Sequence, residues 1–223
     1  SNEEFEEQLS QIQNEYHRDL IKLAKEKTDE LLHLLEEHDG WKQADTKKGG
    51  YKVYTSSDPE TNVLRVLGEG PIEFPMDDVV DILGDYSKRK KMDKMFVEGG
   101  VVEEIGMNTR IEHFRMNASS LVSDRDFVII TRRVHLNNGR IIWTAFSIDY
   151  EDIPPVKKVV RAELIIGGWV LDPHPDDDNQ VYAYYLVQGD PKGNLPKFVV
   201  NMGSKKQGFL PHDVNKAMHK EYS

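Results

Sequence analysis

Apolar residues recur every three or four positions through the first part of the chain. They run from Phe5 to Leu34, and most of the residues between them are glutamate, lysine and glutamine. This spacing predicts one long amphipathic helix over residues 3–37, with a stop at residues 38–40. Because Lys27 interrupts the apolar stripe, both a helix that docks on its own domain and a coiled coil fit the pattern.

After this helix, the pattern changes to alternation of apolar and polar positions, which is typical of strands. Only short connections separate most of these stretches, so parallel pairing, which needs crossover helices, is disfavoured. We therefore expect a mostly antiparallel sheet. The predicted strands cover residues 51–55, 63–68, 101–105, 109–117, 127–136, 140–149, 159–171 and 181–188.

Further helices are predicted where the three-to-four spacing returns. One covers residues 76–96, because Pro75 suits a helix start and Gly99-Gly100 a stop. The chain ends with helical residues 195–206 and 213–222, which Gly208 and Pro211 separate by a kink, a break or a hinge.

The composition narrows the possible functions. The chain has 223 residues, 38% of them hydrophobic, a formal net charge of -10 and no cysteine. An acidic chain is a poor nucleic-acid binder, and no apolar run approaches a membrane span. The lack of cysteine excludes disulfides and thiol nucleophiles. We expect a soluble, cytoplasmic protein without a nucleic-acid partner.

Arg89 and Asp93 stand one helical turn apart, near the apolar line through Val79, Ile82 and Tyr86. A buried charge is unfavourable unless it is paired, so an inward couple suggests a structural ion pair or a polar anchor for a ligand. The surrounding basic run, residues 87–94, also fits an ordinary solvated helix face.

Catalytic and metal-binding patterns are weak. The histidines are scattered, no serine lies in a Gly-x-Ser-x-Gly turn, and the acidic turn beside His174 matches no common metal motif. We predict no catalytic residue, no metal and no cofactor.

An enclosed ligand site is the better candidate. Strand alternation places one polar residue per strand among apolar ones: Glu112 with Phe114 and Met116, and Thr131 with Phe127 and Ile129. A cavity with a few placed polar groups predicts this pattern, and so does an ordinary core that contains a satisfied polar residue.

Three stretches, in this order, resemble the START domain, the steroidogenic-acute-regulatory-protein-related lipid-transfer family. They are residues 123–128 (SDRDFV), 160–163 (VRAE) and 193–201 (GNLPKFVVN). The resemblance covers roughly residues 40–222. It implies an α+β helix-grip fold, in which a curved antiparallel sheet wraps a long C-terminal helix and leaves a tunnel for one lipid. It also implies lipid carriage without catalysis.

This resemblance sets the expected domain organisation. Residues 40–223 would form the START lipid-binding domain, and residues 1–39 an amphipathic helix that packs on it. The expected partners are one phospholipid and, transiently, a membrane surface, with the chain a monomer. Self-association through residues 3–37 is the alternative.

The resemblance to phosphatidylcholine-carrying members implies roles for individual residues. Arg89 would meet the phosphate, and Asp93 would hold the guanidinium in place. Phe114 and Phe127 would contribute to an aromatic cage around choline, in which cation–π attraction holds the ammonium. Ile165 stands where a tyrosine is expected, so the cage is weaker, Tyr184 substitutes for it, or the headgroup differs.

Other ligands stay open. Sterol-carrying members pair an inward acid with an arginine; Glu112 fits the first place, but Thr131 occupies the second. A sterol or ceramide carrier is the first alternative. A hydrolase or cyclase of the wider helix-grip superfamily, with Glu112 as acid or base, is the second.

The resemblance also suggests a membrane gate formed by residues 149–158 and the C-terminal helix. In this loop, apolar residues would insert shallowly and the two lysines would meet anionic headgroups. An exposed loop without this role is the alternative. The predicted gate residues are Ile153, Pro154, Pro155, Val156, Lys157 and Lys158.

Overall fold

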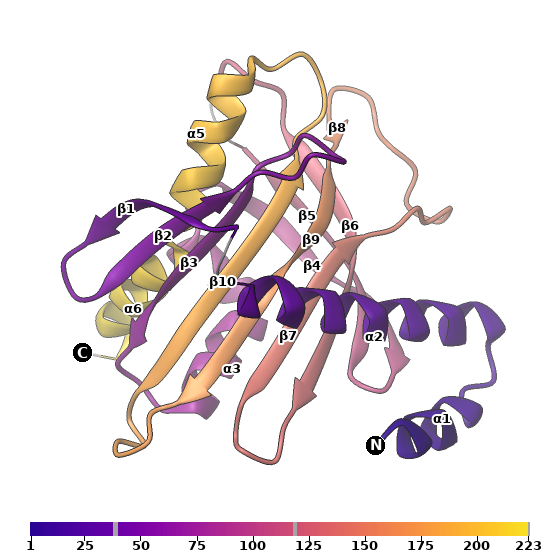
Figure 1. Cartoon of the computed structure of the whole chain (residues 1–223). Helices are drawn as coiled ribbons and strands as arrows, with labels where there is room; N and C mark the ends of the chain where they lie inside the picture. Colours follow the sequence, from indigo (N-terminus) through magenta and orange to yellow (C-terminus); the bar gives the residue numbers. More distant parts are fainter. Residues whose placement is uncertain (38–39, 118–119, 223) are drawn as a thin grey trace.

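One large sheet dominates the structure (Figure 1). The computed structural model describes residues 1–37, 40–117 and 120–222. Within these residues the strand order is β1-β2-β3-β10-β9-β7-β6-β5-β4, and β8 pairs with β6 off this path. Every pairing is antiparallel except that of β8 with β6. The predicted α+β fold with a mostly antiparallel sheet is confirmed.

The strands occur where alternation predicts them, with small shifts at their ends, and β1 was not predicted. Their bounds are β1 Lys42–Lys47, β2 Tyr51–Ser56, β3 Arg65–Ile72, β4 Phe96–Gly106, β5 Thr109–Met116, β6 Arg125–His135, β7 Ile141–Ser147, β8 Val160–Arg161, β9 Glu163–Pro173 and β10 Val181–Asp190.

Two of the predicted helices, over residues 3–37 and 76–96, are each divided in two, whereas the last two helices lie close to their predicted positions. Their bounds are α1 Asn2–Ser10, α2 Glu15–Glu36, α3 Met76–Gly84, α4 Tyr86–Met92, α5 Lys197–Gln207 and α6 Leu210–Glu221. None of the helices in the described ranges is long and apolar enough to cross a bilayer.

The single helix predicted over residues 3–37 is wrong: α1 and α2 are separate. Asn14 has extended backbone angles, and its side chain accepts a hydrogen bond of 3.1 Å from the backbone N–H of His17. A side chain that caps in this way starts a new helix. Of the predicted stop at residues 38–40, residues 38 and 39 lie outside the described residues.

The single helix predicted over residues 76–96 is also wrong. Asp85 is extended between α3 and α4, and its side chain accepts hydrogen bonds from the backbone and hydroxyl of Ser87. Phe96 already belongs to β4, so Gly99 and Gly100 lie within a strand and do not end a helix.

Two groups of helices cover the two faces of the sheet (Figure 1). On the outer face, α2 crosses the strands, and its Ile21 and Ala24 are fully buried against β5 and β6 residues such as Ile111 and Ile130. On the inner face, α3 and α6 enclose a second cluster with β3, β9 and β10. Burial on both faces makes α2 part of the domain core.

The C-terminal segment divides at Gly208. In α6, Val214 and Met218 are fully buried, whereas none of the described side chains of α5 is buried. A Cβ atom on Gly68 of β3 would collide with the Gly208 carbonyl oxygen, so a glycine is required there for the junction to lie on the sheet. The predicted interruption of the C-terminal helical segment near Gly208 is therefore confirmed, as a break between α5 and the anchored α6.

A buried polar network fixes the β2–β3 loop. Asp58 accepts hydrogen bonds from the Gln188 amide at 2.7 Å and the Thr61 hydroxyl at 2.7 Å, and it forms an ion pair with Arg65 at 3.2 Å. Burial alone would raise the pKa of Asp58, but these hydrogen bonds and the Arg65 charge lower it to about 2. The network joins this loop to β10.

We predict that Ile21→Ala destabilises the protein by about 3 kcal/mol, because it removes a fully buried side chain between helix and sheet. Leu23→Ala is the matched control, since Leu23 is 37% exposed on the same helix. Urea unfolding measures both. Equal effects would contradict the packing of α2 as part of the core.

We also predict an acid transition that depends on Asp58. A folded-state pKa below the ordinary value of 3.8 gives stability that is present above about pH 4 and lost as the pH falls toward 2. Asp58→Asn should flatten this part of the curve of unfolding free energy against pH. Gln188→Leu should cost about 2 kcal/mol at neutral pH, because a buried carboxylate loses a donor. If Asp58→Asn left the low-pH part of the curve of unfolding free energy unchanged, the attribution of this transition to Asp58 would be wrong.

Candidate functional site

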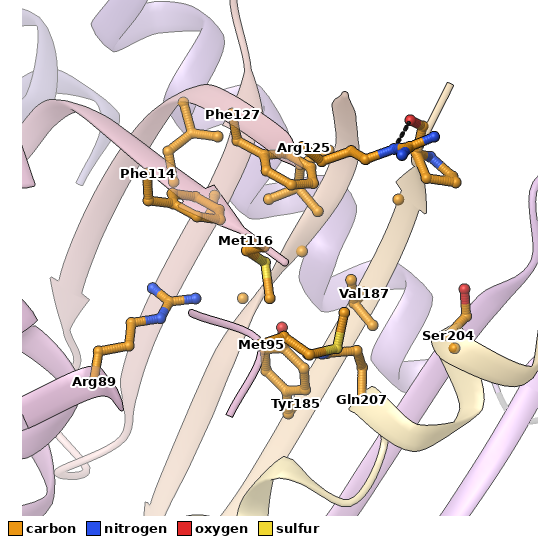
Figure 2. Close-up of a pocket in the computed structure, with 18 of the residues that line it drawn as sticks. Arg89, Met95, Phe114, Met116, Arg125, Phe127, Tyr185, Val187, Ser204 and Gln207 are labelled. Atoms are coloured by element: carbon orange, nitrogen blue, oxygen red, sulfur yellow. Dashed lines mark hydrogen bonds between the residues drawn. The ribbon is translucent and has the colours of Figure 1, made fainter. Parts of the chain in front are cut away.

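A cavity lies between the inner face of the sheet and α5 (Figure 2). Its walls come from α3, α4 and α5 and from strands β5, β6, β7, β9 and β10. Most of the lining is apolar, and Arg89 and Glu112 bring charged groups to it. The arrangement suits a ligand that is largely hydrocarbon with a small polar part.

Arg89 extends from α4 toward the cavity interior (Figure 2). Its guanidinium carbon lies 4.9 Å from the ring centre of Phe114, 5.5 Å from that of Phe96 and 5.8 Å from that of Tyr86. Within the described residues, no hydrogen bond or ion pair involves this guanidinium. Ring faces provide part of the stabilisation that a charge loses on leaving water. The donors of Arg89 stay available to a ligand.

Asp93 is buried but is not part of the cavity lining. One carboxylate oxygen accepts a hydrogen bond of 3.0 Å from the backbone N–H of Met95, and Oδ2 has no hydrogen-bond partner among the described residues. Burial raises the pKa of Asp93, and the nearby Arg89 charge opposes this shift. The two side chains influence each other electrostatically without forming the ion pair that their spacing suggests.

Glu112 and Thr131 face the cavity from neighbouring strands. Glu112 on β5 is 6% exposed, and burial raises its pKa, while a hydrogen bond with the Thr131 hydroxyl and the charge of Arg89 act in the opposite direction. A carboxyl group with a raised pKa can donate a hydrogen bond in its neutral form and accept one in either form.

Aromatic and apolar side chains form the wall beside Arg89. The rings of Phe114 and Phe127 are stacked, with centres 4.9 Å apart and an angle of 11° between the planes. Met116 and Ile129 continue this wall. The structure thus brings together seven predicted ligand residues, namely Arg89, Glu112, Phe114, Met116, Phe127, Ile129 and Thr131.

Ile165 and Tyr184 need correction, because neither lines the cavity. Leu164 and Tyr185 line it instead. The pairing of β9 with β10 contains a register shift, so that Gly189 pairs with Leu164 and Ile165 has no paired residue. A shift of one residue moves a side chain to the other face of a sheet. Tyr184 packs on the outer face with Leu34 and its neighbours.

Tyr185 is half-buried in the cavity wall, and burial raises its pKa to about 12, against the influence of Arg89. Its hydroxyl therefore stays protonated at neutral pH. Trp143, Trp169 and Leu164 also line the cavity and were not predicted. Alternation along β7, β9 and β10 could have identified them, but only with the register of these strands known.

Arg125 fixes the loops at one end of the cavity, and its role was not predicted. Its guanidinium donates hydrogen bonds to the backbone oxygens of Ser123 at 2.6 Å, Pro191 at 3.0 Å and Lys192 at 3.1 Å. Figure 2 shows Arg125 with a dashed line for a hydrogen bond to the backbone. It connects the start of β6 to the segment that leads into α5.

The predicted gate loop packs against the rest of the domain at Ile153. Ile153 is half-buried against the cluster around α1 and α2, and its carbonyl accepts a hydrogen bond of 3.1 Å from Arg161. Arg161 is itself held by two hydrogen bonds to the buried Asp126. Ile153 is therefore not displayed for insertion. The other predicted gate residues, Pro154, Pro155, Val156, Lys157 and Lys158, are exposed.

No group of metal-ligating side chains gathers in the part of the chain that the structure describes. His113 contacts Asp126 at 2.8 Å, but this carboxylate is already occupied by Arg161. The cavity therefore offers hydrogen bonds, the available guanidinium of Arg89 and ring faces.

Comparisons with known proteins identify the family of this chain. The family model described as START domain matches residues 21–212. Human START domain-containing protein 10 is 28% identical over 148 residues, which are 66% of this chain and 49% of that protein. The steroidogenic acute regulatory protein of Xenopus laevis is 27% identical over 191 residues, which are 84% of this chain and 66% of that protein.

A solved structure supports the fold. The human StAR-related lipid transfer protein 5 superposes with a TM-score of 0.84 at 19% sequence identity, covering 91% of this chain and 98% of that chain. At this identity the likeness shows the fold alone. The chain spans about half the length of START domain-containing protein 10.

We predict that Glu112→Gln raises stability at neutral pH. Because the folded-state pKa of Glu112 is raised, the contribution of Glu112 to stability is fully present below the ordinary value of 4.5 and is lost as the pH rises through the folded-state pKa. Glutamine keeps the hydrogen-bonding shape without this loss. Thermal unfolding across pH 4 to pH 8 tests the prediction. A variant that is less stable than wild type at pH 8 would contradict it.

Proposed function

Because the chain belongs to the START domain family, we propose that it holds one phospholipid, of the phosphatidylcholine type, in its cavity and exchanges it at membrane surfaces. In this proposal the acyl chains fill the apolar part of the cavity and the phosphate lies at Arg89. The chain binds and releases its ligand without changing it.

The observation that carries the proposal is the guanidinium of Arg89. It faces an apolar cavity, it has rings around it, and it forms no ion pair with a described carboxylate. A planar guanidinium matches a phosphate with two parallel charge-assisted hydrogen bonds. An anionic group on the ligand would satisfy the donors that the protein leaves available.

We propose that Asp93 acts on Arg89 through its charge, without a direct hydrogen bond. Its unpartnered Oδ2 is buried near the end of α4, and the two groups affect each other's electrostatics. A nearby negative charge lowers the free energy of an unoccupied buried guanidinium. When phosphate arrives, the raised pKa of Asp93 allows the carboxyl group to take a proton, which limits repulsion between the two anions.

The headgroup assignment rests on the stacked rings of Phe114 and Phe127. Ring faces attract a quaternary ammonium by cation–π interaction. Because Ile165 and Tyr184 lie outside the lining, the third ring of a cage would come from another aromatic residue of the lining, such as Tyr185 on β10. A choline group held by two rings is the simplest arrangement.

A lipid with a hydroxyl group, such as a sterol or a ceramide, is the second candidate. It is favoured by Glu112, whose carboxyl group faces the cavity beside Thr131. A hydroxyl could donate to this carboxylate or accept from its protonated form. The same carboxyl group would serve as acid or base in a hydrolase or cyclase, for which product formation lost in Glu112→Gln is the test.

Native mass spectrometry tests the phospholipid proposal. We expect wild-type protein incubated with vesicles of mixed phosphatidylcholine, ceramide and cholesterol to carry one phosphatidylcholine. Arg89→Gln should lose at least about 90% of this adduct, because a phosphate transferred to an apolar site without its cation is unfavourable. Arg115→Gln is the control, since Arg115 lies on the opposite face of β5 and forms surface ion pairs with Glu98 and Asp124.

Two outcomes would contradict the proposal. Equal phosphatidylcholine occupancy in Arg89→Gln and Arg115→Gln would remove the phosphate role of Arg89. An adduct of sterol or ceramide that depends on Glu112 would replace the phospholipid by a hydroxyl lipid. Circular dichroism at the same temperature checks that each variant is folded.

A further inference from the structure

A second pocket lies beside the start of α2, and it shares no lining residue with the cavity that contains Arg89. Its walls come from three parts of the chain: the start of α2, strand β4, and the loop between β7 and β8 together with Arg161 of β8. Its volume is about 840 Å³, which lies in the range of pockets that hold ligands. The proposed lipid site leaves this pocket without a function.

Carboxylates dominate the charge of this pocket. Asp149, Glu151 and Asp152 line it from the loop between β7 and β8, and Glu103 lines it from β4. The three loop carboxylates belong to exposed residues, and none of them forms an ion pair with a described residue. The described part of the protein therefore does not neutralise their charge.

The cations of the lining are already engaged. Arg161 donates two hydrogen bonds to the buried Asp126, at 2.9 Å and 3.0 Å, and a third of 3.1 Å to the backbone oxygen of Ile153. His17 lies 3.3 Å from a carboxylate oxygen of Glu103. The pocket therefore keeps a negative charge that a positively charged ligand would complement.

Two tyrosine rings stand beside these carboxylates. Tyr16 is 46% exposed, and its hydroxyl donates a hydrogen bond of 3.4 Å to the backbone oxygen of Asp149. The Tyr150 hydroxyl donates one of 3.1 Å to Glu103. Burial, followed by the hydrogen bond and charge of Glu103, raises the pKa of Tyr150 to about 12, and burial with the charges of Glu151 and Asp149 raises the pKa of Tyr16. The rings and the carboxylates thus lie close enough to act on one another.

A guanidinium group matches both features of the pocket. Its planar fork forms two parallel hydrogen bonds with a carboxylate, and its flat face stacks on an aromatic ring. A lysine ammonium is a point charge that holds its water more strongly, so it gains less from a neighbouring ring. Three carboxylates without a partner need more than one cation, and a chain segment with several arginines provides them.

We propose that this pocket binds an arginine-containing basic segment of a protein partner, with guanidinium groups on the loop carboxylates and against the ring of Tyr16. An anionic bilayer is unsuited to this surface, because Asp149, Glu151 and Asp152 would repel its headgroups. The proposal does not depend on which lipid occupies the Arg89 cavity.

Fluorescence anisotropy of a labelled peptide titrated with the whole chain tests the proposal. The probe is an octapeptide in which arginine and glycine alternate, and a second probe has lysine in place of each arginine. We expect saturable binding of the arginine peptide and at least about threefold weaker binding of the lysine peptide, because only the guanidinium gains from stacking on a ring. Added salt should weaken both.

The pocket variant carries Asp149→Asn, Glu151→Gln and Asp152→Asn. It should bind the arginine peptide about tenfold more weakly than wild type, because each exposed ion pair contributes roughly two- to fivefold to the affinity. These three side chains are exposed, so their neutral analogues leave the core unchanged.

The matched control carries Asp176→Asn, Asp177→Asn and Asp178→Asn. These residues are exposed in the turn between β9 and β10 and do not line the pocket. The control therefore removes the same charge from an acidic cluster elsewhere on the chain. It should bind the arginine peptide within about twofold of wild type, because charges outside a screening length act weakly.

A variant at Tyr16 separates the ring from the charge. Tyr16→Leu should weaken binding of the arginine peptide by about threefold and leave binding of the lysine peptide unchanged, because the ring is lost and every carboxylate stays. Tyr16→Phe keeps the ring and should retain the preference for arginine.

Equal loss of binding in the pocket variant and the control would overturn the proposal, because overall charge would then be the cause. Absence of peptide binding by the wild type would overturn it as well, and so would equal affinity for the two peptides. Circular dichroism checks that each variant is folded. Phosphatidylcholine occupancy, measured on the same samples by native mass spectrometry, reports on the proposed function separately, since no substituted residue lines the Arg89 cavity.

Discussion

A guanidinium beside an apolar cavity is the constraint on which the site depends. Moving a charge out of water is unfavourable unless other groups replace the hydration. Around Arg89 the described protein offers three ring faces and the charges of Asp93 and Glu112, but no carboxylate oxygen that accepts a hydrogen bond from the guanidinium. The N–H donors of Arg89 that stay without a protein partner favour an anionic group on the ligand, and the apolar lining favours hydrocarbon in the rest of it.

In this fold, the helix that anchors the C-terminal segment in the core and the helix that covers the cavity are two separate helices. On the inner face, α6 inserts buried side chains into the core, while α5 lies over the cavity without a buried described side chain. The close contact of Gly68 with Gly208 holds the junction between them on the sheet. The core does not depend on the side chains of α5, so displacing this helix costs less free energy than displacing α6. This difference suits a cavity that must admit and release a large apolar ligand.

Much of this arrangement could be predicted from the sequence. Strand alternation has a period of two, so Glu112, Phe114 and Met116 had to share a face, and the sheet had to be antiparallel because crossovers were missing. The helix breaks at Asn14 and Asp85 could not be placed, since periodicity continues across a capping residue. Only the structure shows that the side chains of Asn14 and Asp85 accept hydrogen bonds from backbone N–H groups two or three residues later in the chain.

The misplacements of Ile165 and Tyr184 have different origins. A register shift between β9 and β10 leaves Ile165 unpaired, so alternation along β9 predicts the wrong face on one side of the shift. Tyr184 pairs regularly with Val170, and the ordinary alternation of β10 places it on the outer face and Tyr185 on the cavity face. Arg125 was missed for another reason: its partners are backbone oxygens from distant loops, which carry no side-chain signature in a sequence.

A crystal structure of the chain loaded with phosphatidylcholine would test the central claim most directly. The account predicts phosphate oxygens within about 3 Å of the Arg89 guanidinium, with the acyl chains along the wall formed by β5, β6 and α5. A phosphate at the Arg125 end of the cavity, with hydrocarbon beside Arg89, would contradict it.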